Sequence, residues 1–387
     1  MPRLSTRVER LHGSPVRAML EASLHPDVIS FAGGLPAPET FAGIEIPPLP
    51  PALLQYGPTE GEPELRALIA AELAAIGLDC PAERVMVLSG SQQGIDLVAK
   101  LCIDAGSRVA LESPAYLAAL QVFRFFGAAL HPMGAAGWGP GAAPDVAYVI
   151  PTFQNPTGRC WSLDERAALA RACEDEDVVL FEDDPYRELA YEPSERRPIV
   201  SLMRGGSWVY QGSFSKVLSP GLRLGFLAAS EDLFVPLSRL KQAADLHSSR
   251  LGQWAAMHYL KNPARPERLR QLTRRYRDRR DSFARALARH LGRFARWEVP
   301  AGGLFFWVRL NPGLDPPALL ARSMQRKVLF TPGEHFQVDA AAAGPAIRLN
   351  FSNASEAEAE RGLAILGEIL AEMACEAPEA LPGRRSA

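Results

Sequence analysis

The sequence lacks long apolar runs, and its charges nearly cancel. No stretch approaches the roughly 20 apolar residues that a membrane-spanning helix requires, so we expect no membrane span. A net charge of −2 gives no electrostatic basis for binding nucleic acid or a membrane surface. The five cysteines are scattered without a C-x-x-C pair, which is typical of free thiols in a reducing cytoplasm. No apolar run follows the arginines of residues 1–10, so we expect no secretory signal.

Lysine is also scarce, since only five of the 42 lysine and arginine residues are lysines. Lys216 is distinctive among them because Ser213, Ser215 and Arg223 lie beside it in a glycine-containing stretch, residues 212–225. A lysine amine can form a Schiff base with an aldehyde cofactor, and hydroxyls with a guanidinium can hold the cofactor's phosphate. The alternative is an ordinary lysine in a surface loop.

Short apolar strands alternate with helices between residues 85 and 229. The pattern predicts strands at 85–88, 109–111, 146–150, 178–181, 208–210 and 224–227, and helices at 91–102, 115–126 and 163–174. This alternation indicates an α/β fold with a largely parallel sheet that is covered on both faces. Ligands bind such sheets at the strand ends, where loops carry the chemistry.

A long helical pattern and an α+β unit follow. The arginines of residues 265–280 could form an RNA-binding face, but interrupting acids and the lack of an aromatic platform favour a solvated helix face. Further strands are predicted near 304–310 and 346–351, and helices near 317–326 and 356–373. We expect a large domain over residues 48–278, and a small domain made of residues 1–47 and 279–387.

Two turns carry candidate ligand-binding groups. The turn at residues 89–94, Ser-Gly-Ser-Gln-Gln-Gly, joins a strand to a helix, and free amides at a helix N-terminus favour a phosphate. Many strand–helix turns are equally rich in Gly and Ser. The Asn155-Pro156-Thr157-Gly158 segment is either a simple turn or a rigid mount for the Asn155 side chain at the sheet edge.

Acidic and aromatic residues follow two other strands. Glu182, Asp183 and Asp184 could bind a metal, but their spacing matches no metal loop and no histidine is near, so we predict no metal. The alternative to a metal site is that one of these carboxylates faces a protonated heterocyclic nitrogen. Tyr116 begins a predicted helix, where it could stack on a flat cofactor or belong to the core.

Taken in order, these segments resemble one family over residues 28–370. The chain resembles the fold-type I, pyridoxal-phosphate-dependent aminotransferases of class I/II, and among them the 2-aminoadipate/kynurenine aminotransferase branch. The segments that carry the resemblance are residues 29–36, 54–61, 89–93, 155–158, 182–186, 212–225 and 347–352.

The resemblance implies an aspartate-aminotransferase-like large domain with a mostly parallel seven-stranded sheet, a smaller α+β domain, and a homodimer with shared active sites. It assigns catalysis to Lys216, Asp183 and Tyr186. The residues implied to bind pyridoxal 5′-phosphate are Ser91, Gln92, Tyr116, Asn155, Asp183, Tyr186, Ser213, Ser215, Lys216 and Arg223, with Tyr56 supplied by the neighbouring subunit. Arg348 is implied to grip the substrate carboxylate, and Asn155 and Gly34 to lie against the substrate.

The implied reaction is ping-pong transamination between an L-amino acid and a 2-oxo acid. A β-lyase on the same fold and a ligand-sensing aminotransferase-like module are the alternatives. Segment 14–17, Ser-Pro-Val-Arg, is typical of a helix start. Arg17 in this segment could bind a second substrate carboxylate, as in glutamate or 2-aminoadipate, or it could be a solvent-exposed arginine. The other possible substrate class is that of large apolar or aromatic amino acids.

Overall fold

The computed structural model describes residues 4–11, 25, 27–41, 47–134, 137–139, 141–339 and 344–376. Seven strands form its large sheet in the order β2-β8-β7-β6-β5-β3-β4. Neighbours from β7 to β4 are parallel, whereas β8 is antiparallel to both β7 and β2. The strands are β2 (Val85–Leu88), β3 (Arg108–Glu112), β4 (Ala129–Met133), β5 (Val146–Val149), β6 (Val179–Asp183), β7 (Trp208–Ser213) and β8 (Gly225–Ala229). The predicted α/β class with a mostly parallel sheet is therefore confirmed.

Sequence patterns identify six of the seven strands and miss β4. This strand is the edge of the sheet and pairs only with β3 among the described strands. Its residues are largely exposed or half-buried and include Pro132. A proline is tolerated at an edge because no further strand needs its amide hydrogen. The strand therefore has no apolar alternation that a sequence pattern could detect.

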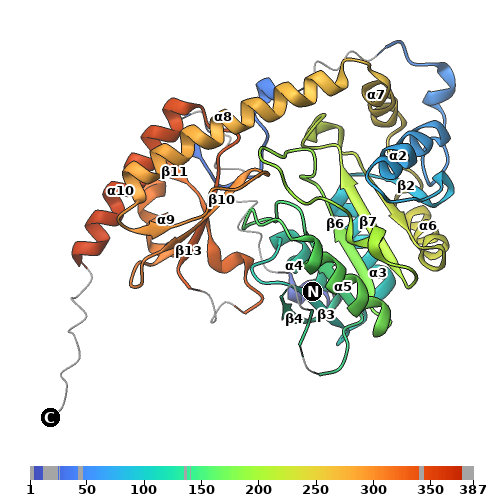
Figure 1. Ribbon diagram of the computed structural model, residues 1–387, viewed down its shortest axis with the longest axis horizontal. Coiled ribbons are helices and arrows are strands. Elements are labelled where there is room, and N and C mark those ends of the chain that lie inside the picture. Colours follow the sequence, from blue (N-terminus) through green and yellow to red (C-terminus); the bar gives the residue numbers. More distant parts are fainter. Residues whose placement is uncertain are drawn as a thin grey trace.

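Helices cover both faces of the sheet (Figure 1). One face packs against α3 (Ser91–Cys102), α4 (Leu117–Phe126) and α6 (Glu231–Asp245). The other packs against α2 (Pro63–Ala75), α5 (Leu163–Asp175) and α7 (Arg250–Lys261). All four residues of β2 and of β5 are buried. Burial on both faces explains why these strands read as continuous apolar runs.

A smaller sheet lies beside the large one, in the order β12-β13-β10-β9 (Figure 1). Its strands are β9 (Ala295–Arg296), β10 (Phe305–Leu310), β12 (Thr331–Pro332) and β13 (Ala346–Asn350). It packs with α8 (Arg265–Leu291), α9 (Pro316–Gln325) and α10 (Glu356–Glu376) around a separate apolar core. The 3-10 helices are Val8–Arg10, Pro38–Thr40, Pro51–Leu54, Ala82–Arg84, Ile199–Leu202, Pro220–Leu222 and Gly333–Phe336.

The N-terminal segment joins this smaller unit through β1 (Ile29–Ser30), which pairs in parallel with β11 (Val328–Leu329). The predicted boundary between residues 278 and 279 falls inside α8, which runs from beside the large sheet into the smaller unit (Figure 1). The domain limits therefore stay a prediction. Among the described residues, no helix is long and apolar enough to cross a membrane.

The arginine-rich face of α8 is only partly solvated. Arg270, Arg274 and Arg277 are exposed, as predicted. Arg280 is instead buried, where it donates to the carbonyl of Pro300 (3.0 Å) and pairs with Glu192 (2.9 Å). The prediction of a solvated helix face is therefore wrong at this position, because internal partners replace the water around the guanidinium.

Candidate active site

A cavity of about 240 Å³ opens at the carboxyl ends of β5, β6 and β7, beside the starts of α3 and α4. It lies where an open α/β sheet is expected to bind its ligand. The cavity contains the ten residues predicted to bind the cofactor from the same subunit, together with Ile150 and Pro185, which were not predicted. The lining residues are Ser91, Gln92, Tyr116, Ile150, Asn155, Asp183, Pro185, Tyr186, Ser213, Ser215, Lys216 and Arg223.

Lys216 is the amine of this cavity. It lies three residues beyond β7, and its Nζ donates to the carbonyl of Gly34 at 2.9 Å. Burial, assisted by the positive charges of Arg223 and Arg348, lowers the pKa of Lys216 to about 8. A lysine with this pKa is partly unprotonated near neutral pH, so it can act as a nucleophile or a base.

One end of the cavity suits an anion. Helix α3 begins there without a side-chain cap, after Gly90 at φ +84°. A Cβ on Gly90 would lie 2.6 Å from Nη2 of Arg223, and one on Gly225 would lie 2.8 Å from the backbone nitrogen of Ser91. These glycines therefore let a guanidinium and a strand approach the helix start closely. Uncapped amides at a helix N-terminus beside an arginine attract a phosphate.

A buried carboxylate lies elsewhere on the cavity wall. Asp183 is 2% exposed, and its Oδ2 accepts a hydrogen bond from the Tyr148 hydroxyl at 2.8 Å. Its Oδ1 is buried and has no hydrogen-bond partner within bonding distance among the described residues. Burial raises the pKa of Asp183 to about 7. Such an oxygen is suited to accept a proton or a hydrogen bond from a ligand in the cavity.

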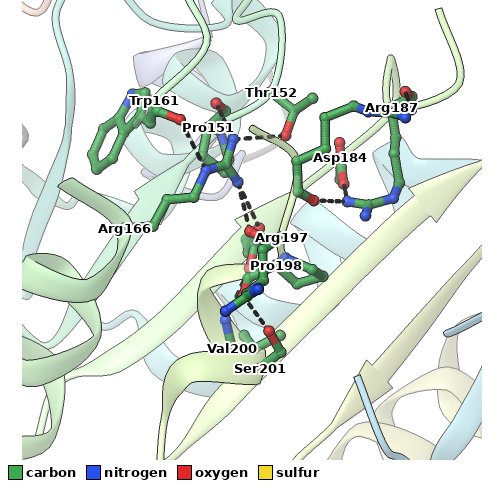
Figure 2. A network of polar contacts seen from close by, with 12 residues as sticks. Pro151, Thr152, Trp161, Arg166, Asp184, Arg187, Arg197, Pro198, Val200 and Ser201 are labelled. Atoms are coloured by element: carbon green, nitrogen blue, oxygen red, sulfur yellow. Dashed lines mark hydrogen bonds and ion pairs between the residues drawn. The ribbon is translucent and has the colours of Figure 1, made fainter. Parts of the chain in front are cut away.

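The two acids that flank Asp183 have partners on the opposite face of the sheet. Oδ2 of Asp184 accepts from the Tyr210 hydroxyl (2.9 Å) and from Arg187 (3.0 Å), toward which it points in Figure 2. Glu182 accepts from the Val200 amide at 3.1 Å, and burial raises its pKa to about 8. Strand alternation thus places only the middle acid on the cavity side.

Arg166 is a fully buried residue that the sequence did not single out. Figure 2 shows its guanidinium directed at the carbonyls of Pro151 and Trp161 and at the hydroxyl of Thr152. It also lies 3.9 Å from the Glu182 carboxylate. Because Pro151 and Thr152 begin the segment that leads to Asn155, this arginine anchors one wall of the cavity from behind. An arginine in an amphipathic helix gives no sequence signal of such burial.

Arg348, on β13 of the smaller sheet, contacts Asn155 in the wall of the cavity. Its Nη1 donates to Oδ1 of Asn155 at 2.9 Å, and the Asn155 amide donates to the Tyr186 hydroxyl at 3.3 Å. The guanidinium lies 4.3 Å from the ring centre of Phe305 and 4.8 Å from that of Phe336. Burial lowers the pKa of Arg348 to about 10, so the group remains a cation at neutral pH. A buried planar cation of this kind suits a carboxylate.

Two further predicted residues, Gly34 and Tyr56, are not among the residues that line the cavity. Gly34 is adjacent through its bond to Lys216, but Tyr56 is 76% exposed, with its ring 5.9 Å from that of His247. Arg17 lies outside the described residues. Within the described ranges, no group of three His, Cys, Asp or Glu residues could hold a metal ion.

Comparisons with known proteins identify the family. The model for the aminotransferases of class I and II matches residues 50–366. The chain is 35% identical to a 2-aminoadipate transaminase of Thermus thermophilus, covering 93% of this chain and 94% of that protein. It is 33% identical to aromatic-amino-acid aminotransferase 1 of Thermococcus litoralis, covering 94% and 92%. A solved alpha-aminoadipate aminotransferase of Thermus thermophilus, complexed with N-(5′-phosphopyridoxyl)-L-leucine, superposes with a TM-score of 0.84 at 34% identity, covering 96% and 98%.

These similarities confirm the predicted family, the pyridoxal-phosphate cofactor and the transamination of amino acids, and they favour neither a β-lyase nor a ligand-sensing module. The chain belongs to the aminotransferases of class I and II.

Proposed function

We propose that this aminotransferase holds its cofactor in the cavity at the ends of β5, β6 and β7, with Lys216 as the residue that binds it covalently. The observation that carries this proposal is the joint presence of an amine, an anion-binding helix start and a buried carboxylate in one cavity. Each group matches one part of pyridoxal phosphate: the aldehyde, the phosphate and the ring nitrogen.

The residues present fit the cofactor at both ends. Ser91, Gln92, Ser213, Ser215 and Arg223 would hold the phosphate with uncapped amides, hydroxyls and a guanidinium. At the other end, the unpartnered Oδ1 of Asp183 would accept the hydrogen of a protonated ring nitrogen. That pairing would also compensate for the burial of the carboxylate.

The ring and its substituents have further candidate partners. Tyr116 would stack on the ring, while Asn155 and Tyr186, which already share a hydrogen bond, would contact its phenolic oxygen. Their place in the cavity lining supports these roles.

The chemistry divides between the cofactor and the chain. When bound, pyridoxal phosphate withdraws electrons from the α-carbon of an attached amino acid, which makes the hydrogen on that carbon acidic. Nζ of Lys216 is the base that accepts this proton, since its lowered pKa keeps part of the amine unprotonated. Arg348 holds the α-carboxylate and thereby orients the α-carbon toward the base. Gly34, whose carbonyl lies 2.9 Å from Nζ, borders the substrate.

We propose two classes of amino donor: dicarboxylates such as 2-aminoadipate or glutamate, and large apolar or aromatic amino acids. The names of the relatives support both classes. Arg17 would bind the second carboxylate of the first class. Replacing Arg17 by Gln should then raise KM for glutamate and leave KM for leucine unchanged; an equal loss for both substrates would reject this role.

We further propose a homodimer, located in the cytoplasm, in which Tyr56 reaches the cofactor phosphate of the partner. Tyr56 and Leu54 are 76% and 78% exposed, and Tyr56 lies outside its own subunit's cavity. Exposed large side chains of this kind support a contact with a second copy.

A spectroscopic experiment tests the proposed site. Single amino acids are added, without any oxo acid, to the yellow cofactor-loaded enzyme. We expect donors to bleach the visible absorbance, and we expect no bleaching with Lys216→Ala, which lacks the proposed base. Bleaching of the Lys216→Ala enzyme at the wild-type rate would reject the assignment.

A further inference from the structure

Lys241, one of the five lysines, is buried and has no part in the reaction as proposed. Its side chain in α6 is 0% exposed. Nζ lies within hydrogen-bond distance of Oε1 of Gln93 (2.8 Å), both carboxylate oxygens of Asp245 (2.7 and 2.8 Å) and Oγ of Ser248 (2.9 Å). A buried ammonium is tolerated only when it is paired and fully hydrogen-bonded, as it is here. Its three hydrogens therefore fix the positions of these acceptors.

The same acceptors hold the turn that precedes α3. Oε1 of Gln93 also accepts the backbone N–H of Ser89 (2.8 Å), and its amide donates to Oδ2 of Asp245 (2.8 Å). The hydroxyl of Ser89 donates to that same oxygen (2.9 Å), while Ser248 donates to the carbonyl of Val87 (3.1 Å). Although partial burial works to raise it, the hydrogen bonds from Lys241, Gln93 and Ser89 keep the pKa of Asp245 below its usual value. The Asp245 carboxylate is thus ionised at neutral pH.

This turn is the anion-binding end of the cavity. It contains Gly90 at φ +84° and ψ +156°, a backbone conformation open almost only to glycine. Ser91 and Gln92 follow directly and line the cavity, whereas Lys241 and Asp245 do not. The Lys241 ammonium contacts Gln93, Asp245 and Ser248. It would therefore affect a bound phosphate by fixing the shape of the turn, not by touching the phosphate.

We propose that Lys241 is a positioning residue for the cofactor phosphate: with Asp245 and Gln93 it fixes the turn at residues 89–93, so that Ser91 and Gln92 are held in place to bind the phosphate. The inference rests on the proposed function, because it requires the phosphate to bind at this turn. The competing explanation is that Lys241 only packs α6 against α3.

The test compares pyridoxal phosphate with pyridoxal, which lacks the phosphate, by titrating each into the full-length apoenzyme. Lys241→Met should raise Kd for pyridoxal phosphate by about tenfold or more, the loss expected when hydrogen bonds to a charged group are misplaced. Kd for pyridoxal should stay within about twofold, because that ligand makes no phosphate contact. An equal rise in both constants, or a rise in neither, would overturn the inference.

Lys100→Met is the matched control. Lys100 also pairs with an aspartate four residues away, Asp96, at 2.5 Å, but both side chains are 37% exposed. We expect neither Kd to change. A selective loss of pyridoxal phosphate binding in this variant would also overturn the inference, because any lysine charge would then suffice.

Gln93→Met provides the second variant, since it retains the Lys241–Asp245 pair and cuts its link to the Ser89 amide. We expect the same selective rise in Kd for pyridoxal phosphate, and this variant decides the matter if Lys241→Met does not fold. If the ratio of the two Kd values is unchanged in Gln93→Met, the inference about Lys241 fails while the proposed cofactor site stands. If the wild-type apoenzyme binds pyridoxal as tightly as pyridoxal phosphate, the proposed cofactor site itself fails.

Discussion

Arg348 and Asn155 meet through a 2.9 Å hydrogen bond, although 193 positions separate them in the chain. One residue comes from the smaller sheet and the other from a loop of the large sheet. The bond therefore ties the proposed carboxylate-binding cation to the wall of the proposed cofactor cavity.

The first prediction concerns this pair. Arg348→Lys should lower kcat/KM for amino acids about 10- to 100-fold, because an ammonium cannot replace the two-pronged guanidinium that grips a carboxylate. Steady-state kinetics measure the loss. The loss should be less than additive with that of Asn155→Ala, because the two side chains are in contact. Full additivity would show that the Arg348–Asn155 contact does not contribute to catalysis. As a control, kcat/KM for amines without an α-carboxylate should change little in Arg348→Lys.

The second prediction concerns pH. Since Lys216 has a pKa of about 8, the amine is mostly protonated below this pH and mostly free above it. The rate at which the apoenzyme captures pyridoxal phosphate should therefore rise with pH, with a midpoint near 8, and then level off. Stopped-flow absorbance measures this rate.

Arg348→Met should move that midpoint to higher pH, because the positive charge of Arg348 is one of the causes that lower the pKa of Lys216. Arg322→Met, at a partly exposed arginine paired with Glu376, serves as the control and should leave the midpoint unchanged. A wild-type midpoint close to 10.5, the value of an unperturbed lysine, would contradict the assignment.

The third prediction tests sharing between subunits. Tyr56→Phe should raise Kd for pyridoxal phosphate about 10- to 100-fold, through loss of one hydrogen bond to the phosphate. A mixed dimer of Tyr56→Phe and Lys216→Ala subunits should contain one intact site, because the intact Tyr56 faces the intact Lys216. At a pyridoxal phosphate concentration that saturates the wild type but not Tyr56→Phe, unfolding and refolding the two variants together should therefore give more activity than the sum of the two. If the refolded mixture is no more active than the sum of its parts, Tyr56 does not act across the interface.

The fourth prediction concerns stability. Arg166→Met should lower the free energy of unfolding by about 3–5 kcal/mol, because it leaves the buried carbonyls of Trp161 and Pro151 without their donor and removes the cation 3.9 Å from the buried Glu182 carboxylate. Urea denaturation measures this change, with Arg159→Met as the control. Arg159 pairs with Glu165 while half of its side chain is exposed, so we expect a much smaller effect. Equal stability of the two variants would contradict the proposed anchoring.

The sequence predicts most strands of the large sheet and the order of its motifs, because apolar patterns and turn residues are local signals. It predicts neither the burial of Arg166 nor that of Lys241, because charged residues in amphipathic helices normally face water. The aromatic contacts of Arg348 with Phe305 and Phe336 were likewise missed. They depend on how distant segments pack, which no local pattern encodes.

Strand β6 supplies the proposed cofactor cavity with a single carboxylate, that of Asp183. Glu182 and Asp184 flank Asp183, yet both are bound to partners across the sheet. A shift of one residue in register would exchange the faces and bring two acids into the cavity. Neither neighbouring carboxylate can therefore replace that of Asp183. In an Asp183→Asn variant, the cavity loses this negative charge, and neither Glu182 nor Asp184 restores it.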